Sequence, residues 1–202
     1  MLLTLTSAGI PYQTTWEHLQ DELHRLRMRI VRRLRSKGRR LQDVGRNGLQ
    51  GLVISEDEIA TLLRELDRTN DDHGAVDGDD WAAPLSAIDA RIGARKAASA
   101  RETIRLPLSQ LCDVFNLSPF EEQCLVIAAA PELDVRYEKI YAFLQDDVTK
   151  KKPTVGLMID LLCDTAEEAL DARRLFASRA PLNKYHFVRS DKIGRASCRE
   201  RV

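Results

Sequence analysis

The chain has 202 residues, a formal net charge of zero, a charged fraction of 31% and an aromatic fraction of 5%. This length allows one or two domains, and the charge balance excludes a protein that coats nucleic acid through an overall positive charge. The apolar stretches are too short for a membrane span, and the N-terminus lacks the basic segment of a signal peptide, so we expect a cytoplasmic protein that does not bind membranes.

Residues 1–69 are predicted to form an N-terminal helical arm. Within Thr14–Arg40, apolar residues recur at three- and four-residue steps, which places them on one face of a long helix. Ser55 and Glu58 then match a capping box, and an apolar stripe follows them, so we predict a shorter second helix and a helical hairpin. The apolar stripe of the first helix is Trp16, Leu19, Leu23, Leu26, Ile30 and Leu34.

A basic run marks the second half of the long helix. Arg25–Arg40 contains nine Lys or Arg residues and no acid. We interpret it as an exposed helical face whose arginine stems cover apolar surface. The alternatives are a stripe that binds nucleic acid or a membrane surface, and a stripe that pairs with an acidic partner. The acidic segment Glu56–Asp80 of the same chain is a candidate for that partner.

Residues 70–84 are predicted to form an acidic linker. Asn70–Pro84 is rich in Asp and Gly and shows no helical or strand periodicity. The acids suggest a calcium loop, but no register supplies alternating oxygen ligands with Gly at the sixth position and Glu at the twelfth.

Residues 85–192 are predicted to form a helix-turn-helix or winged-helix domain, so the fold class is mainly α. Ser118, Pro119 and Glu121 give a clear helix start, with an N-cap, a proline at the first position and a capping-box acid. We expect Pro131 to follow the end of that helix. Tyr185 and Phe187 alternate with polar residues in Pro181–Arg189, which we predict to be the first strand of a truncated wing. The other predicted helices are Leu85–Ala100, Leu108–Phe115, Asp134–Gln145 with Val135 facing inward, Pro153–Cys163, and a helix capped by Thr165 and Glu168 that runs through Phe176.

The last ten residues, Ile193–Val202, read IGRASCRERV. One codon choice for this stretch resembles a widely used short-read sequencing adapter translated in one frame. We therefore expect residues 193–202 to be a non-native tail, and the natural protein to continue past Lys192.

The region Leu117–Cys163 carries a family resemblance. Its most specific segments are Pro131–Asp134, Arg136–Glu138 and Tyr141–Asp147. In composition and mutual spacing they are similar to the winged-helix domain that precedes the motor in a group of bacterial AAA+ ATPases, some of which accompany contractile injection systems. Trp16–Leu19 and Gly51–Ser55 resemble the N-terminal helical segment of the same group.

The resemblance implies a non-catalytic regulatory or partner-binding region of an ATP-driven machine. No Gly-x-x-x-x-Gly-Lys-Ser/Thr loop occurs in the chain, so no catalytic or cofactor-binding residue is assigned to it. ATP and Mg²⁺ are expected for the full-length parent, an ATPase, and its ring-shaped homo-oligomer would contact a protein partner or substrate. The alternatives are a standalone winged-helix DNA-binding regulator and a helical scaffold without a motor.

DNA binding depends on the helix Pro153–Cys163, which is the candidate recognition helix, and on the preceding Lys150–Lys152. The helix offers only Thr154 and Asp160 as polar groups, with no Arg, Asn or Gln to read base edges. We therefore favour protein binding over DNA binding and interpret the three lysines as a solvated turn.

The remaining polar clusters are interpreted as structural, so no catalytic or metal-binding residue is proposed. Asp134, Arg136 and Glu138 are expected to form caps and salt bridges, with Arg136 pointing away from the two acids. Asp146 and Asp147 are expected to cap a helix or pair with Lys150 and Lys151. The histidines show no ligand spacing, and the cysteines form no CxxC pair and are expected to be reduced thiols. These residues are His18, His24, His73, His186, Cys112, Cys124, Cys163 and Cys198.

Overall fold

The computed structural model describes residues 9–43, 61 and 81–188, with side chains up to Ser36 in the first helix. All regular secondary structure in these residues is helical, which confirms the mainly α class. The predicted helix after Ser55, most of the predicted linker and the tail 193–202 lie outside these residues. The helices are α1 (Thr15–Asp43), α3 (Ala82–Arg101), α4 (Pro107–Phe115), α5 (Pro119–Leu133), α6 (Arg136–Leu144), α7 (Val155–Leu162), α8 (Ala166–Ala172), the 3₁₀ helix η1 (Arg173–Phe176) and α9 (Pro181–Lys184).

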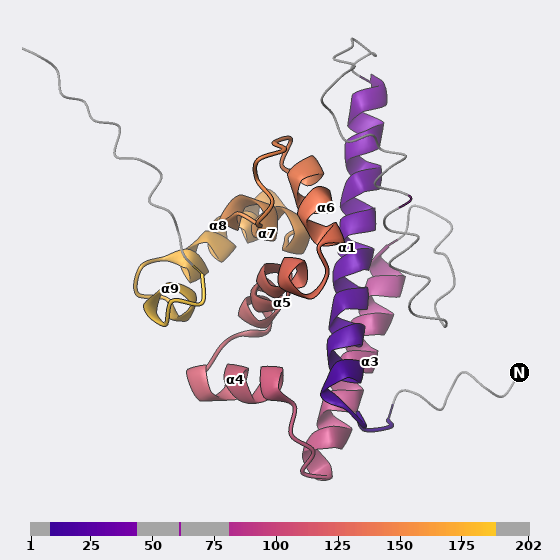
Figure 1. Ribbon diagram of the computed structural model, residues 1–202, viewed down its shortest axis with the longest axis vertical. Coiled ribbons are helices and arrows are strands. Elements are labelled where there is room, and N and C mark those ends of the chain that lie inside the picture. The colour runs from indigo at the N-terminus through magenta and orange to yellow at the C-terminus, as the bar shows by residue number, and fades with distance from the viewer. Residues whose placement is uncertain (1–8, 44–60, 62–80, 189–202) are drawn as a thin grey trace, which may run out of the picture.

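Helix α1 is the longest of the described elements, and α3, α5 and α7 pack along its sides (Figure 1). One core joins Leu26 and Ile30 of α1 to Ile127 of α5, Ile140 of α6 and Leu161 of α7, all of them buried. Because burial of such side chains is the main favourable contribution to folding, α1 stabilises the helices from α5 onward directly.

A second apolar cluster joins α1 to α3. Met28 of α1 packs there with Trp81, Leu85, Ile88 and Ile92, which lie at or after the start of α3. The spacing of these α3 residues puts them on one face, so α3 lies along α1 (Figure 1). Helix α1 therefore has apolar contacts on two sides.

Local capping signals are confirmed. Ser118 accepts a hydrogen bond from the amide of Glu121, and the Glu121 carboxylate accepts one from the amide of Ser118, so both halves of the capping box are present. Thr165 and Glu168 form the same reciprocal pair at α8. Thr154 caps α7 by accepting from the amide of Leu157.

Pro131 lies inside α5, so the prediction that it follows the helix is wrong. A proline has no amide hydrogen and cannot donate to the carbonyl of Ile127, four residues earlier. The hydroxyl of Tyr141 donates to that carbonyl instead, at 2.9 Å. A side chain of α6 thereby satisfies the acceptor that the proline leaves free, and α5 continues to Leu133.

Replacement of Tyr141 with Phe tests this account of Pro131. The variant keeps the buried ring but leaves the carbonyl of Ile127 without its donor, so we expect a loss of about 1 to 3 kcal/mol in the free energy of unfolding. Urea unfolding measures the change. Tyr185→Phe is the matched control, because the Tyr185 side chain is 41% exposed. Equal effects of the two variants would contradict the proposed role of the hydroxyl.

Two predicted orientations are wrong. Trp16 is 54% exposed and Val135 is 68% exposed, although both were expected to face the core. Trp16 lies in the first turn of α1, and its spacing matches the apolar stripe, but the described residues leave more than half of its side chain exposed. Val135 is the N-cap of α6 and precedes the part of the helix that packs.

The predicted wing strand at Pro181–Arg189 is also wrong within the described residues. Pro181 starts the short helix α9, and the chain then turns through His186, whose φ is 60°. The alternation of Tyr185 and Phe187 reflects packing of both rings against Phe115 of α4, at centroid distances of 4.7 and 4.9 Å. A contact between segments distant in sequence thus produces the pattern that resembles a strand.

Candidate functional site

Helix α7, the candidate recognition helix, is packed into the protein. Leu157, Met158, Ile159 and Leu161 are all buried, and α7 contacts both α1 and α5. A recognition helix must present side chains to the major groove. The described surface of α7 presents no side chain that reads base edges.

The polar groups of α7 are used within the protein. Thr154 caps the helix, as described above, and Asp160 forms an ion pair with Arg33 of α1. Because Asp160 is held by an arginine of the neighbouring helix, it fixes α7 against α1. The two polar groups that the sequence offered for DNA contacts therefore have structural partners.

Each lysine of the Lys150–Lys152 turn has an acid of the same chain near it. The ammonium groups of Lys150, Lys151 and Lys152 lie 3.3 Å from carboxylate oxygens of Asp147, Glu138 and Glu132, respectively. Such exposed pairs add little stability. They do place negative charge beside the turn, which weakens its attraction for phosphates. Asp146 and Asp147 were expected to cap a helix or to pair with Lys150 and Lys151: Asp147 does pair with Lys150, whereas Lys151 pairs with Glu138.

The first part of the basic run of α1 is not the exposed face that its sequence suggested, although Arg35 is exposed, and the side chains of residues 37–40 lie outside the described ones. Arg25 and Arg27 are 8% and 5% exposed. Arg25 reaches Asp89 of α3 at 3.0 Å, and Arg32 reaches Asp164 after α7 at 2.7 Å. Asp89 and Asp164 thus come from parts of the chain that follow α1, and Arg25 also pairs with Glu22 of α1 itself. The acidic segment Glu56–Asp80 lies, apart from Thr61, outside the described residues, so its role as a partner stays a prediction.

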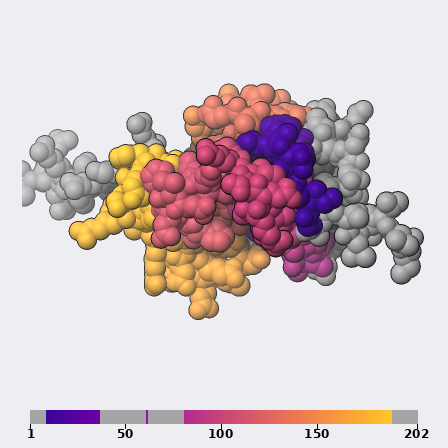
Figure 2. Space-filling view, turned by 90° about the horizontal axis from the view of Figure 1, so that it is seen from below, coloured from indigo at the N-terminus to yellow at the C-terminus, as the bar shows by residue number. Residues whose placement is uncertain are grey.

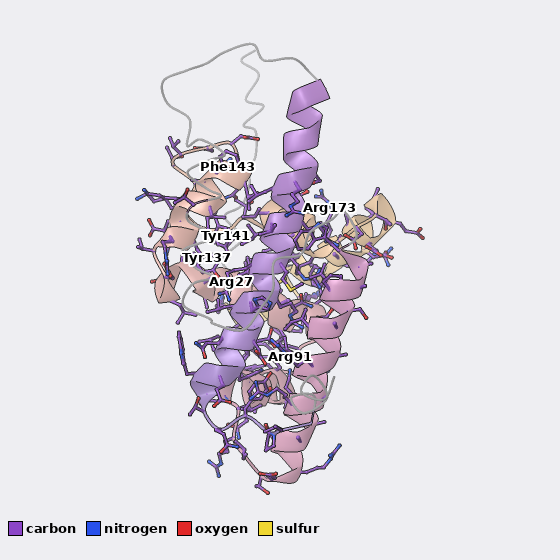
Figure 3. All side chains as sticks on the ribbon, turned by 90° about the vertical axis from the view of Figure 1, so that its right-hand side faces the viewer. Arg27, Arg91, Tyr137, Tyr141, Phe143 and Arg173 are labelled. Atoms are coloured by element: carbon purple, nitrogen blue, oxygen red, sulfur yellow. The ribbon has the colours of Figure 1, made fainter. Side chains whose placement is uncertain are left out.

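Arg27 points toward α6 rather than toward solvent. Figure 3 shows Arg27 on α1 facing Tyr137, with Tyr141 one turn further along α6. Burial raises the pKa of Tyr137, and the Arg27 guanidinium opposes that change only in part. Arg27 therefore contributes positive charge to the interface between α1 and α6.

A buried group of three ionisable side chains lies where α1, α3 and α5 meet. Ligating atoms of His18, Glu22 and Glu122 all lie within 4.8 Å of one another, and all three residues are buried. His18 Nε2 is 3.6 Å from Glu22 Oε1, and neither atom has a hydrogen-bond partner among the described residues. His18 and Glu22 are four residues apart on α1, and Glu122 comes from the first turn of α5. The histidines were expected to show no ligand spacing, and His18 has no second histidine near it in this group, although two glutamates lie within ligand distance.

A divalent metal does not fit this group, because two positively charged side chains already neutralise the carboxylates. The ammonium of Lys96 lies 2.7 and 2.8 Å from the two oxygens of Glu122. The guanidinium of Arg25 pairs with Glu22. Addition of a doubly charged ion would leave two uncompensated positive charges in a buried site, at a large desolvation cost. We interpret the group as an ion-pair network that fixes three helices, and call it the buried charge network.

A neighbouring network ties α1 to α3. Asp21 binds Arg91 at 2.9 Å and Arg95 at 3.0 Å, and it accepts a hydrogen bond from the hydroxyl of Tyr12. Arg95 also pairs with Glu17 and stacks over the Tyr12 ring, 4.0 Å from its centroid. These contacts hold the residues before α1 against α3.

The buried charge network predicts a pH dependence of stability. Burial alone raises the pKa of Glu22, but the His18 ring and the Arg25 charge outweigh it, so the pKa lies below its ordinary value. A carboxylate with a depressed folded-state pKa stabilises the fold above its unfolded pKa, about 4.3, and this stabilisation is lost as the pH falls through the folded pKa. When the pH is lowered from 6 to 3, we expect the urea concentration at the unfolding midpoint to decrease more for the unaltered chain than for the Glu22→Gln variant. Parallel pH profiles for the two proteins would contradict this.

The Asp134 cluster is a set of structural ion pairs, as predicted, but the orientation of Arg136 was wrong. Its guanidinium reaches Asp134 Oδ2 at 2.6 Å. Asp134 is in an extended conformation after α5, so the assumption of a continuous helix misplaced the two side chains. The hydrogen bond from Arg136 is the main reason that the pKa of Asp134 is lowered.

The described cysteines are free thiols. Cys112 and Cys124 are buried, and burial raises the pKa of each to about 12. Since the thiolate is the nucleophilic form, neither is a candidate for catalysis.

Sequence reasoning missed the buried charge network because its members come from three separate helices. Two signals were present. Glu22 falls one position before Leu23 of the apolar stripe, and Glu122 lies in a helix that is otherwise apolar nearly all round. Charged residues at positions that face a core are expected to be paired.

A family model for the winged helix domain, variant, matches residues 4–199. The chain therefore belongs to this winged-helix family. No curated protein and no solved structure gives a significant match. Among the described residues, no helix is both long and apolar enough to cross a membrane.

Proposed function

We propose that this winged-helix variant is a regulatory, protein-binding module and that it does not read DNA sequence. The observation that carries the proposal is the position of α7. Its apolar residues fill the core against α1 and α5, and Asp160 is paired with Arg33. Without base-reading side chains on the described surface of this helix, the usual mechanism of sequence recognition lacks its contacts.

We further propose that the module belongs to the N-terminal region of an AAA+ ATPase. The support is the resemblance of Pro131–Asp134, Arg136–Glu138 and Tyr141–Asp147 to that group, together with the winged-helix family match. These segments also contact one another in the structure. The Tyr141 hydroxyl donates to the α5 carbonyl that Pro131 leaves without a donor, and Arg136 pairs with Asp134. In this proposal, ATP and Mg²⁺ bind a motor encoded downstream, and the parent assembles as a ring.

Binding to DNA duplexes tests the first proposal. We expect a fluorescein-labelled duplex of random sequence to show weak, salt-dependent anisotropy changes that are equal for the unaltered chain and for a Lys150→Ala, Lys151→Ala, Lys152→Ala triple variant. Sequence-specific binding that the triple variant weakens by about tenfold or more would contradict it and would favour a standalone DNA-binding regulator.

The coding sequence beyond Lys192 tests the AAA+ proposal. An open frame with a Gly-x-x-x-x-Gly-Lys-Ser/Thr loop is expected in genomic DNA, in place of the codons for Ile193–Val202. A natural reading frame that encodes Ile193–Val202 and then stops would contradict both the AAA+ parent and the non-native tail. The family match reaches residue 199, so genomic sequence is needed to decide between the two origins of this stretch. The present chain should show no ATP hydrolysis.

A further inference from the structure

Uncompensated positive charge gathers at one place on the described surface. Residues 172–188 contain four exposed cations and no acid. Three of these cations form no ion pair with any described residue, and the fourth, Arg174, has only the exposed Asp171 at 3.5 Å. This differs from α1 and from the Lys150–Lys152 turn, where the cations meet acids of the same chain. The four cations are Arg173, Arg174, Arg179 and Lys184.

An exposed aromatic ring lies beside one of these cations, Lys184. Tyr185 is 41% exposed, and its ring packs against Phe115 of α4, with Phe187 in contact with both. The ammonium of Lys184 lies over the Tyr185 ring, 4.9 Å from its centroid.

The fold holds these groups in place. Leu182 of α9 is fully buried in the main core, and its carbonyl accepts a hydrogen bond from the amide of Val188. Helix α9 also packs on η1. In the view of Figure 2, the yellow atoms of the α9 region lie beside the magenta atoms of the α4 region. We call this part the basic aromatic surface; it consists of the rings of Phe115, Tyr185 and Phe187, of Lys184, and of Arg179 in the turn that leads into α9.

We propose that the basic aromatic surface binds an acidic segment of a protein partner, with an apolar side chain of that segment against Tyr185. The inference rests on the proposed regulatory function and names the chemistry of the partner. Tyr and Arg are enriched at the energetic centres of protein interfaces, and an exposed apolar patch with a charged rim is typical of a binding site. Acidic residues of the partner complement the cations, which guide its approach and orientation.

The surroundings favour a protein partner over nucleic acid. Glu167, Glu168 and Asp171 are exposed on α8, which leads directly into η1, and Asp113 is exposed on α4, which ends at Phe115. These acids repel a continuous phosphate backbone but leave room for a peptide with separate charges.

Fluorescence anisotropy with the full chain at low salt tests the proposal. The probe is a fluorescein-labelled synthetic peptide with Leu and Phe on one helical face among Glu and Asp residues. One control peptide carries Lys in place of each acid, and another carries Ala in place of Leu and Phe. A short DNA duplex is the fourth probe. The protein variants are Arg179→Glu with Lys184→Glu, and Tyr185→Ala. Arg101→Glu is the matched control, since Arg101 is an exposed cation at the end of α3.

The acidic amphipathic peptide is expected to bind, and both control peptides to bind more weakly. The double charge reversal and Tyr185→Ala are each expected to weaken binding by about tenfold, and Arg101→Glu by less than about twofold. Because Arg179 and Lys184 are exposed, the double variant should stay folded even if Tyr185→Ala does not. Undetectable peptide binding, insensitivity to the double variant, or tighter binding of the duplex at this surface would overturn the inference. Duplex binding that instead depends on Lys150–Lys152 would contradict the proposed function. The peptide measurements would still show whether the basic aromatic surface binds an acidic segment.

Discussion

Replacement of Ile30 with Ala is expected to lower the free energy of unfolding by about 3 kcal/mol. Ile30 is fully buried in the core that α1 shares with α5, α6 and α7. Removal of its side chain creates a cavity at the point where the N-terminal helix supports the winged-helix region. Urea unfolding followed by circular dichroism gives the change.

Trp16→Ala is the control for Ile30→Ala on the same helix. Trp16 is larger than isoleucine but 54% exposed, so its loss is expected to change the free energy of unfolding by less than about 1 kcal/mol. A comparable effect of the two substitutions would contradict the described packing of α1. If α1 were a separate arm, Ile30→Ala would leave the main unfolding transition unchanged, and this result would contradict the shared core.

Replacement of Glu22 with Ala is expected to cost about 3 kcal/mol of unfolding free energy. The Glu22 side chain has no exposed surface, and its partners His18 and Arg25 are buried beside it. Loss of the carboxylate leaves the charge of Arg25 with only the more exposed Asp89. The cost therefore comes mainly from an uncompensated buried group, rather than from the lost attraction itself.

Asp171→Ala is the matched control for Glu22→Ala. Asp171 also pairs with an arginine, Arg174, but both side chains are largely exposed, so the expected effect is below about 1 kcal/mol. Equal losses in the two variants would show that the buried charge network does not fix the helices.

The sequence predicted the helices well where the signal was local. Ser118 with Glu121, and Thr165 with Glu168, place their acceptors and donors within one turn, so the capping boxes could be recognised from spacing alone. The apolar period of α1 likewise identified Leu23, Leu26 and Ile30 as core residues.

The errors arose where a distant residue decides the structure. Pro131 stays in α5 because Tyr141 replaces the missing donor, and no local rule contains that contact. Tyr185 and Phe187 alternate because both meet Phe115, rather than because they form a strand.

The candidate functional features depended even more on tertiary contacts. Arg25–Arg40 looked like a free basic surface, yet Arg25 is buried and pairs with Glu22 of the same helix and with Asp89 of α3. The sequence did not distinguish the cations of residues 172–188 from the others, because only the structure shows which cations have acidic partners.

The central claim is that α7 is a core helix and not a DNA-reading helix. Amide hydrogen exchange of the full chain, with and without a DNA duplex at low salt, tests it most directly. The account predicts that peptides covering Val155–Leu162 exchange only through global unfolding and that DNA does not change their rate. Fast exchange of α7 in the free protein, together with slower exchange when DNA is added, would contradict the claim.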